Sequence, residues 1–226
     1  MTPSLASVYD ALIARAADAD LANVVGEIRD AFVRRVGPFA PTDAWFEERS
    51  AALWDRVLTN ARVRASMEHR PETTHEMRAV LESLGRGQRG LFEVHAATPD
   101  VDLVCVATGA AFRLARSDDA GRALASGHGG ADDVAPGVID AHVVPTTEGV
   151  SILPGVLAHT AEATPFIAEV LARGHERGMS HDDLLDALLA MRHRLASLSR
   201  MKPKQVYRVE MLDAFLATVM GTSPSP

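Results

Sequence analysis

The amino-acid sequence predicts an α+β fold, in which a small antiparallel β-barrel or meander, SH3-like or OB-like, is flanked by N-terminal and C-terminal helical segments. Apolar residues recur at helical spacing up to residue 84 and again after residue 156. Between these segments lie short runs in which apolar and polar residues alternate, separated by tight turns. No connection holds a helix long enough for a parallel crossover, so we expect antiparallel pairing.

We expect four parts along the chain. They are a helical segment over 1–86, a β module over 87–156, a helical segment over 157–220 and a disordered tail over 221–226. The β module contains a long loop, 117–136, that is rich in Asp, Gly and Ala. A loop of this length inside a compact domain is often functional or disordered.

Helical periodicity in the first part predicts helices over 4–17, 20–36, 42–60 and 73–84. Thr42 or Asp43 can cap the third of these helices, because their side-chain oxygens accept hydrogen bonds from free amides of a first turn. Thr73 and Glu76 have the spacing of a capping box, which predicts that the fourth helix begins there.

The β module is expected to hold five strands. They cover residues 91–97, 101–107, 110–116, 137–144 and 150–153. In the fourth strand Ile139, Ala141 and Val143 alternate with Asp140 and His142, which predicts one apolar face. The preceding run 85–90 matches the dinucleotide-binding pattern G-x-G-x-x-G, but it follows a helix and precedes a strand. That order is the reverse of the one phosphate binding needs, so we interpret the run as a helix end and linker.

The last part is expected to be helical again. Thr164-Pro165 begins one helix, because proline is favoured at the first helical position. A second helix begins at the cap Ser180 and carries a single apolar stripe. Pro203 interrupts it, and residues 205–220 are predicted to form a last amphipathic helix.

Composition points to the cytoplasm. The single cysteine, Cys105, excludes an internal disulfide and a multi-cysteine zinc site. The first twenty residues lack a basic region followed by an apolar one, and no apolar run approaches the roughly 20 residues of a membrane span. We therefore expect a cytoplasmic protein without a membrane partner. No cofactor is indicated, and the oligomeric state is left open.

Positive charge is concentrated near the C-terminus. Residues 187–209 carry no acid and a charge of +6, so the rest of a chain of net charge −7 carries −13. Such a stretch can bind nucleic acid or another polyanion by neutralising phosphates. The residues expected to do so are Arg200, Lys202, Lys204 and Arg208, with Tyr207 stacking on a base. The alternative is a solvated helix whose charges follow the helix dipole, with Asp182, Asp183 and Asp186 at its acidic start.

A metal site is a further possibility. His128, Asp132 and Asp133 share the long loop, and His142 would join them if the loop folds back over its strand. Imidazole and carboxylate ligands suit a hard or borderline divalent ion. The alternative is a solvated acidic loop.

These observations rank three functions. The first is a non-enzymatic interaction or regulatory protein, whose β module and helices bind another protein. The second is nucleic-acid or other polyanion binding through the basic segment 192–208. The third is a metal-dependent or acid–base enzyme centred on loop 117–136. The enzyme hypothesis ranks last because no motif in the sequence has the structural context that its chemistry requires.

Overall fold

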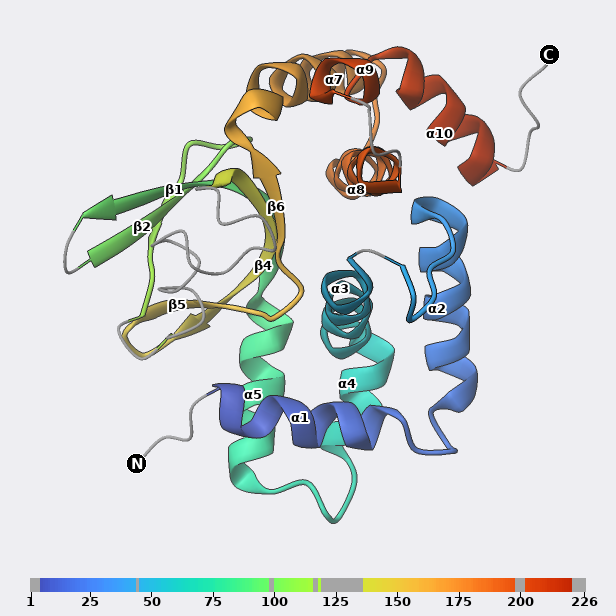
Figure 1. Ribbon diagram of the computed structural model, residues 1–226. Helices are drawn as coiled ribbons and strands as arrows, with labels where there is room; N and C mark the ends of the chain where they lie inside the picture. Colours follow the sequence, from blue (N-terminus) through green and yellow to red (C-terminus); the bar gives the residue numbers. More distant parts are fainter. Residues whose placement is uncertain are drawn as a thin grey trace.

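The computed structural model describes residues 5–43, 45–97, 100–115, 118, 136–197 and 202–220. It is an α+β protein in which a curled antiparallel sheet forms a half-barrel with helices beside it, as expected from the sequence (Figure 1). The N-terminal helices gather at one end of the molecule and the C-terminal helices at the other (Figure 1). The sheet therefore lies beside both helical groups (Figure 1).

The first helical group has five members. They are α1 (Leu5–Ala16), α2 (Ala22–Val36), α3 (Phe46–Thr59), α4 (Ala61–Glu68) and α5 (His75–Arg86). Helix α3 begins at Phe46, later than predicted, because the carboxylate of Asp43 accepts a hydrogen bond from the Ala40 amide (2.8 Å) and closes a turn ahead of the helix. The cap of α5 is Thr74 instead of Thr73: Thr74 accepts from the Met77 amide at 3.2 Å.

The sheet contains six strands in the described residues. They are β1 (Gln88–Ala97), β2 (Asp100–Cys105), β3 (Ala111–Arg113), β4 (Pro136–Thr146), β5 (Gly149–Ile152) and β6 (Leu157–Thr160). Their order is β3-β2-β1-β4-β5, and β6 also pairs with β4. All these ladders are antiparallel, and a bridge between Leu114 and Val150 brings the two ends of the sheet together.

Two features of the sheet differ from the prediction. The order is not that of a simple meander, because β4 returns to pair with β1, with Phe92 opposite Ile139. Strand β6 lies in the segment expected to be helical, so Pro154-Gly155 is a connection within the sheet and not its end. Leu-Ala-His-Thr is too short to show strand periodicity by itself, and β6 exists because the N-terminal half of β4 offers it a free edge.

The predicted alternation in β4 is confirmed. Ile139, Ala141 and Val143 belong to the apolar cluster inside the half-barrel. The buried members of this cluster are Phe92, Val101, Leu103, Cys105, Leu114, Ile139, Ala141, Val143 and Ile152. The intervening side chains do not face open solvent, since Asp140 is 2% exposed and His142 is half-buried. Helices therefore cover the convex face of the sheet at this point.

The second helical group follows a short 3-10 turn, η1 (Ala161–Ala163). It consists of α7 (Thr164–Glu176), α8 (His181–Ser197), α9 (Pro203–Val206) and α10 (Glu210–Met220). Helix α8 is buried on more than the single predicted stripe, since Leu184, Leu185, Leu188 and Leu189 are all at most 1% exposed. The prediction of a single helix over residues 205–220 is wrong. The chain bends after α9, where the buried Tyr207 ends the helix.

Candidate functional site

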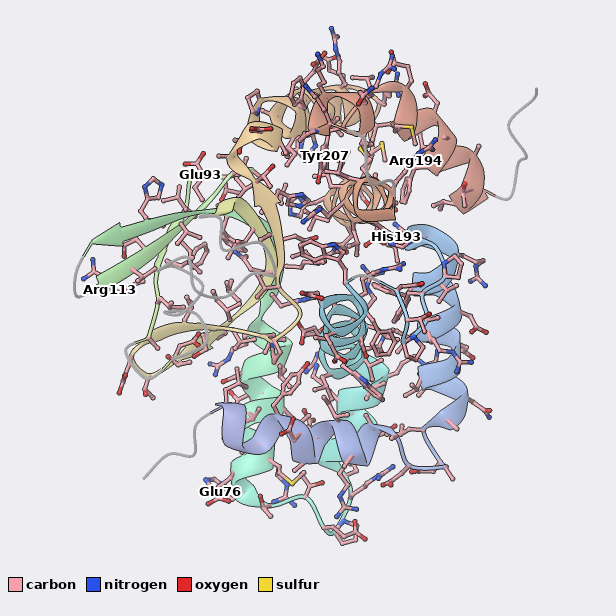
Figure 2. All side chains as sticks on the ribbon, viewed as in Figure 1. Glu76, Glu93, Arg113, His193, Arg194 and Tyr207 are labelled. Carbon is pink, nitrogen blue, oxygen red and sulfur yellow. The ribbon has the colours of Figure 1, made fainter. Side chains whose placement is uncertain are left out.

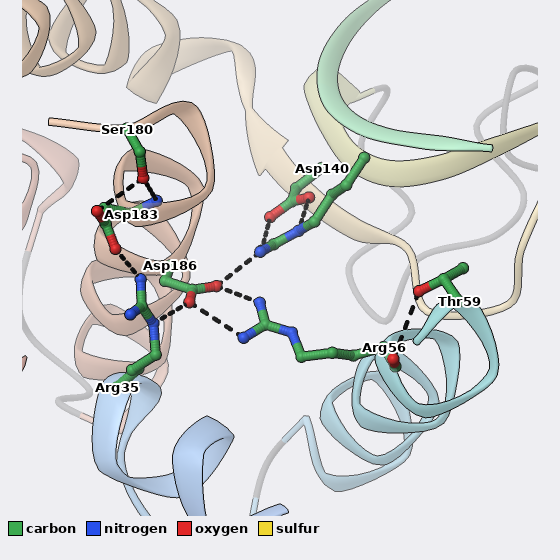
Figure 3. Close-up of polar contacts among 8 residues, drawn as sticks. Arg35, Arg56, Thr59, Asp140, Ser180, Asp183 and Asp186 are labelled. Carbon is green, nitrogen blue, oxygen red and sulfur yellow. Dashed lines mark hydrogen bonds and ion pairs between the residues drawn. The ribbon is translucent and has the colours of Figure 1, made fainter. Parts of the chain in front are cut away.

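The most concentrated group of charges in the described residues is an ionic cluster centred on Asp186 of α8 (Figure 3). Arg89 of β1 donates from Nη1 to Asp186 Oδ1 at 2.6 Å, and Arg56 of α3 donates from Nη1 to Oδ2 at 3.1 Å. Arg35 of α2 donates to the same carboxylate. One buried side chain thereby connects two N-terminal helices, the sheet and the C-terminal helical group.

Two further carboxylates complete the cluster. The carboxylate of Asp140 of β4 accepts two hydrogen bonds from one edge of the Arg89 guanidinium, from Nε at 2.9 Å and from Nη2 at 2.6 Å. Asp183 pairs with Arg35 and also accepts a hydrogen bond from the Ser180 hydroxyl at 2.7 Å. Three arginines therefore face three aspartates, and the charges balance. Bidentate Arg–Asp geometry of this kind is among the strongest polar contacts in proteins.

Electrostatics keep Asp186 ionised. Burial by itself would raise the pKa of Asp186, but hydrogen bonds and charge from Arg56 and Arg89 outweigh burial and hold the pKa well below its ordinary value. The carboxylate oxygens of Asp186 are already shared by guanidinium groups. The arrangement is therefore suited to holding elements in place, and less suited to binding a substrate.

Another buried carboxylate, that of Asp55 of α3, lies outside this cluster, where α1 meets the connection between β5 and β6. Its Oδ2 accepts a hydrogen bond from the Gly155 amide at 2.8 Å, and its Oδ1 accepts one from the Tyr9 hydroxyl. Burial raises the pKa of Asp55 to about 7, although these two hydrogen bonds and the charge of Arg89 oppose the change. Asp55 thus changes its charge near neutral pH.

Of the residues expected at a metal site, His142 is described, whereas His128, Asp132 and Asp133 lie outside the described residues. Burial lowers the pKa of His142 to about 3, helped by the charges of Arg89 and Arg56. His142 is therefore neutral but lies near two guanidinium groups, and such surroundings disfavour another cation. Within the described ranges, no group of three His, Cys, Asp or Glu side chains is placed to hold a metal ion.

The residues expected to bind a polyanion differ in their exposure and in their partners. Lys202 and Lys204 are exposed, Arg208 pairs with Glu210 at 3.1 Å, and Arg200 lies outside the described residues. Tyr207 is 2% exposed, so its ring is not available for stacking on a base. Its hydroxyl instead contacts His159 Nδ1 at 2.7 Å, inside the protein.

The first two arginines of the basic segment 192–208 also differ in exposure. Arg192 is buried, donates from Nε to the Ala158 carbonyl at 3.1 Å and lies over the Trp45 ring, 3.9 Å from its centroid. Arg194 is exposed, and Figure 2 shows it beside α10. This separation agrees with the helical spacing, since residues two apart on a helix do not share a face.

Comparison with known proteins finds no matching family model, curated protein or solved structure. In the described part of the chain, no helix is both long and apolar enough to cross a bilayer.

Sequence reasoning missed the ionic cluster. Asp186 was interpreted as one of three acids that favour a helix N-terminus, whereas in the structure it is 1% exposed. A usable signal was present, because Asp186 lies between Leu185 and Ala187 in a run that is otherwise apolar. A charge in the apolar stripe of a helix predicts a buried partner of opposite charge.

Proposed function

We propose that this chain is a non-enzymatic interaction or regulatory protein, which binds an extended segment of a partner protein along the free edge of β1. The main support for the proposal is that β1 extends beyond the residues with which β4 pairs. Strand β4 pairs with Gln88–Phe92, whereas residues 93–97 pair with β2 alone among the described residues.

The direction of the backbone groups supports this proposal. The Leu91 carbonyl accepts from the Val106 amide at 2.9 Å, so the backbone of Leu91 points toward β2. Backbone groups in a strand alternate between its two edges, so those of Val94 point away from β2. They lie on the edge along which β4 pairs with Gln88–Phe92. Unpaired amides and carbonyls on a strand edge are a template for pairing with another chain.

The location of this edge is also favourable. Glu93 and His95 are exposed on the outer side of the hairpin, and their side chains lie 3.3 Å apart. Figure 2 shows Glu93 on the outer side of β1. An extended peptide that adds to the edge would gain main-chain hydrogen bonds, with alternate side chains giving specificity.

The proposal places the protein in the cytoplasm and treats the half-barrel as a small module of the SH3-like or OB-like kind. Its support is the curled antiparallel sheet. The ionic cluster has a supporting role, because it joins the helices to β1 and β4 and so keeps the strand edge rigid. A rigid edge loses less conformational entropy on binding.

A matched pair of variants at Val94 tests the proposal. Val94→Pro removes the amide from the free edge, whereas Val94→Ala removes side-chain packing but keeps the amide. We expect crosslinked affinity capture from cytosolic extract to recover a partner with the wild type and with Val94→Ala, and to lose it with Val94→Pro. Unfolding in urea would establish that both variants fold. Equal recovery with Val94→Pro, or no partner with the wild type, would contradict the proposal.

A further inference from the structure

We propose that a shallow pocket between η1–α7 and α9 binds a small anion that carries a phosphate group. The pocket is open to solvent, has a volume of about 180 Å³ and is lined by Glu162, Phe166, Lys202, Pro203 and Lys204. This site is remote in sequence from the β1 edge and is independent of the function proposed for it.

The two lysines supply uncompensated positive charge. In the part of the chain that the structure describes, neither Lys202 nor Lys204 has a carboxylate within ion-pair distance, whereas two nearby arginines do. Arg177 pairs with Asp213 at 2.8 Å, and Arg208 pairs with Glu210 at 3.1 Å. Lysine ammonium groups bind phosphate as compact point charges, and two of them at one pocket exceed the single charge of Glu162.

The backbone that carries the lysines is anchored. The Lys202 amide donates to Gln205 Oε1 at 2.8 Å, and Pro203 restricts the backbone between the two lysines. Beneath them Val206 is 1% exposed and packs in the core with α8. The positions of the two side-chain stems are therefore largely set before an anion arrives, which lowers the entropic cost of binding.

The walls of the pocket are partly apolar. Phe166 lies partly buried against the core of the C-terminal helices, and Pro203 contributes a second apolar surface. Ligand pockets commonly combine apolar walls with a few polar groups that fix orientation. A phosphate ester with a ring or a short apolar group matches this combination better than free phosphate does.

The charge around the pocket favours a small ligand over a long polyanion. The exposed carboxylates of Glu176, Glu210 and Asp213, on α7 and α10, each pair with an arginine. A nucleic acid that extends beyond the lysines would meet these neutral charge pairs, on a protein whose net charge is −7. At physiological ionic strength charges are screened over about 8 Å, so a compact anion interacts mainly with the nearby lysines.

Calorimetric titration with phenyl phosphate and with inorganic phosphate tests this inference on the full chain. We expect phenyl phosphate to bind more tightly than inorganic phosphate. The double variant Lys202→Gln and Lys204→Gln should weaken binding of phenyl phosphate by at least about tenfold, or about 1.4 kcal/mol. The matched control is Arg34→Gln with Arg78→Gln, which removes the same charge from exposed positions on α2 and α5 and should leave binding unchanged.

Three results would overturn the inference. These are no binding of phenyl phosphate by the wild type, equal weakening by the control variant, or tighter binding of single-stranded DNA that also depends on the two lysines. The last result would assign the surface to a polyanion. None of these results bears on the Val94 variants, so the two proposals can fail separately.

Discussion

Arg89 and Asp186 are 97 residues apart in the chain, yet Arg89 Nη1 lies 2.6 Å from Asp186 Oδ1 in the interior. The Arg89 side chain is 10% exposed and that of Asp186 is 1% exposed. The pair joins the sheet to the longest helix, while the same guanidinium holds Asp140 (Figure 3). Removing one member of such a buried pair leaves the other charge without compensation, which costs more than the pair contributes when intact.

Asp186→Asn is therefore expected to be strongly destabilising. It leaves Arg35, Arg56 and Arg89 with one fewer counter-charge, and we expect the free energy of unfolding to fall by about 3 kcal/mol or more. Urea unfolding followed by circular dichroism measures this change. The control is Asp182→Asn, one turn earlier in α8, where the side chain is exposed and the change should stay within about 0.5 kcal/mol. Equal losses for the two variants would show that the cluster does not stabilise the fold.

Asp55 is expected to make stability depend on pH. Its pKa is about 7 in the folded protein and about 4 in an unfolded chain. Between these two pH values the folded state binds one more proton than the unfolded state does. The stability that Asp55 adds is therefore fully present below about pH 4 and is lost as the pH rises through about 7. The unfolding free energy of the wild type minus that of Asp55→Asn should fall by at most about 1.4 kcal/mol per pH unit in this window. Parallel pH profiles for the two proteins would contradict the prediction.

Two glycines are expected to respond to alanine in opposite ways. At Gly155 an added Cβ would lie 2.4 Å from Asp55 Oδ2 and 2.5 Å from the Ala52 Cα, so Gly155→Ala should destabilise the protein by about 2 kcal/mol. At Gly26, inside α2, an added Cβ meets nothing within 4 Å. Gly26→Ala should therefore stabilise it by roughly 0.5–1 kcal/mol. Thermal unfolding compares the two variants, and a stable Gly155→Ala protein would disprove the close approach of α3 to this connection.

Local patterns were sufficient for much of the fold. The alternation of Ile139, Ala141 and Val143 predicted which side of β4 faces the barrel interior. Ser180 was predicted to cap a helix, and its hydroxyl accepts from the Asp183 amide at 3.2 Å. Each of these features depends on residues a few positions apart, so the physical cause lies within the sequence window that reveals it.

The candidate sites were less predictable for a physical reason. Lys202 and Lys204 were expected to be exposed cations, and they are. Tyr207 was expected on the same surface, but its ring packs beneath α9 and its hydroxyl meets His159, 48 residues away in the chain. Side-chain burial depends on which distant element packs over a residue, and the spacing within one helix does not reveal it.

The sequence by itself determined the α+β class, the approximate limits of most helices and strands and the apolar face of β4, because periods of two and 3.6 residues and helix caps act over short distances. The tertiary structure decided that β4 pairs with β1, that β6 extends the sheet, and that Asp186 gathers three arginines from three elements. These contacts form only when distant segments of the chain pack together. Packing removes water from the charged side chains, and a buried charge is costly unless it is paired, so the charges that come together become partners.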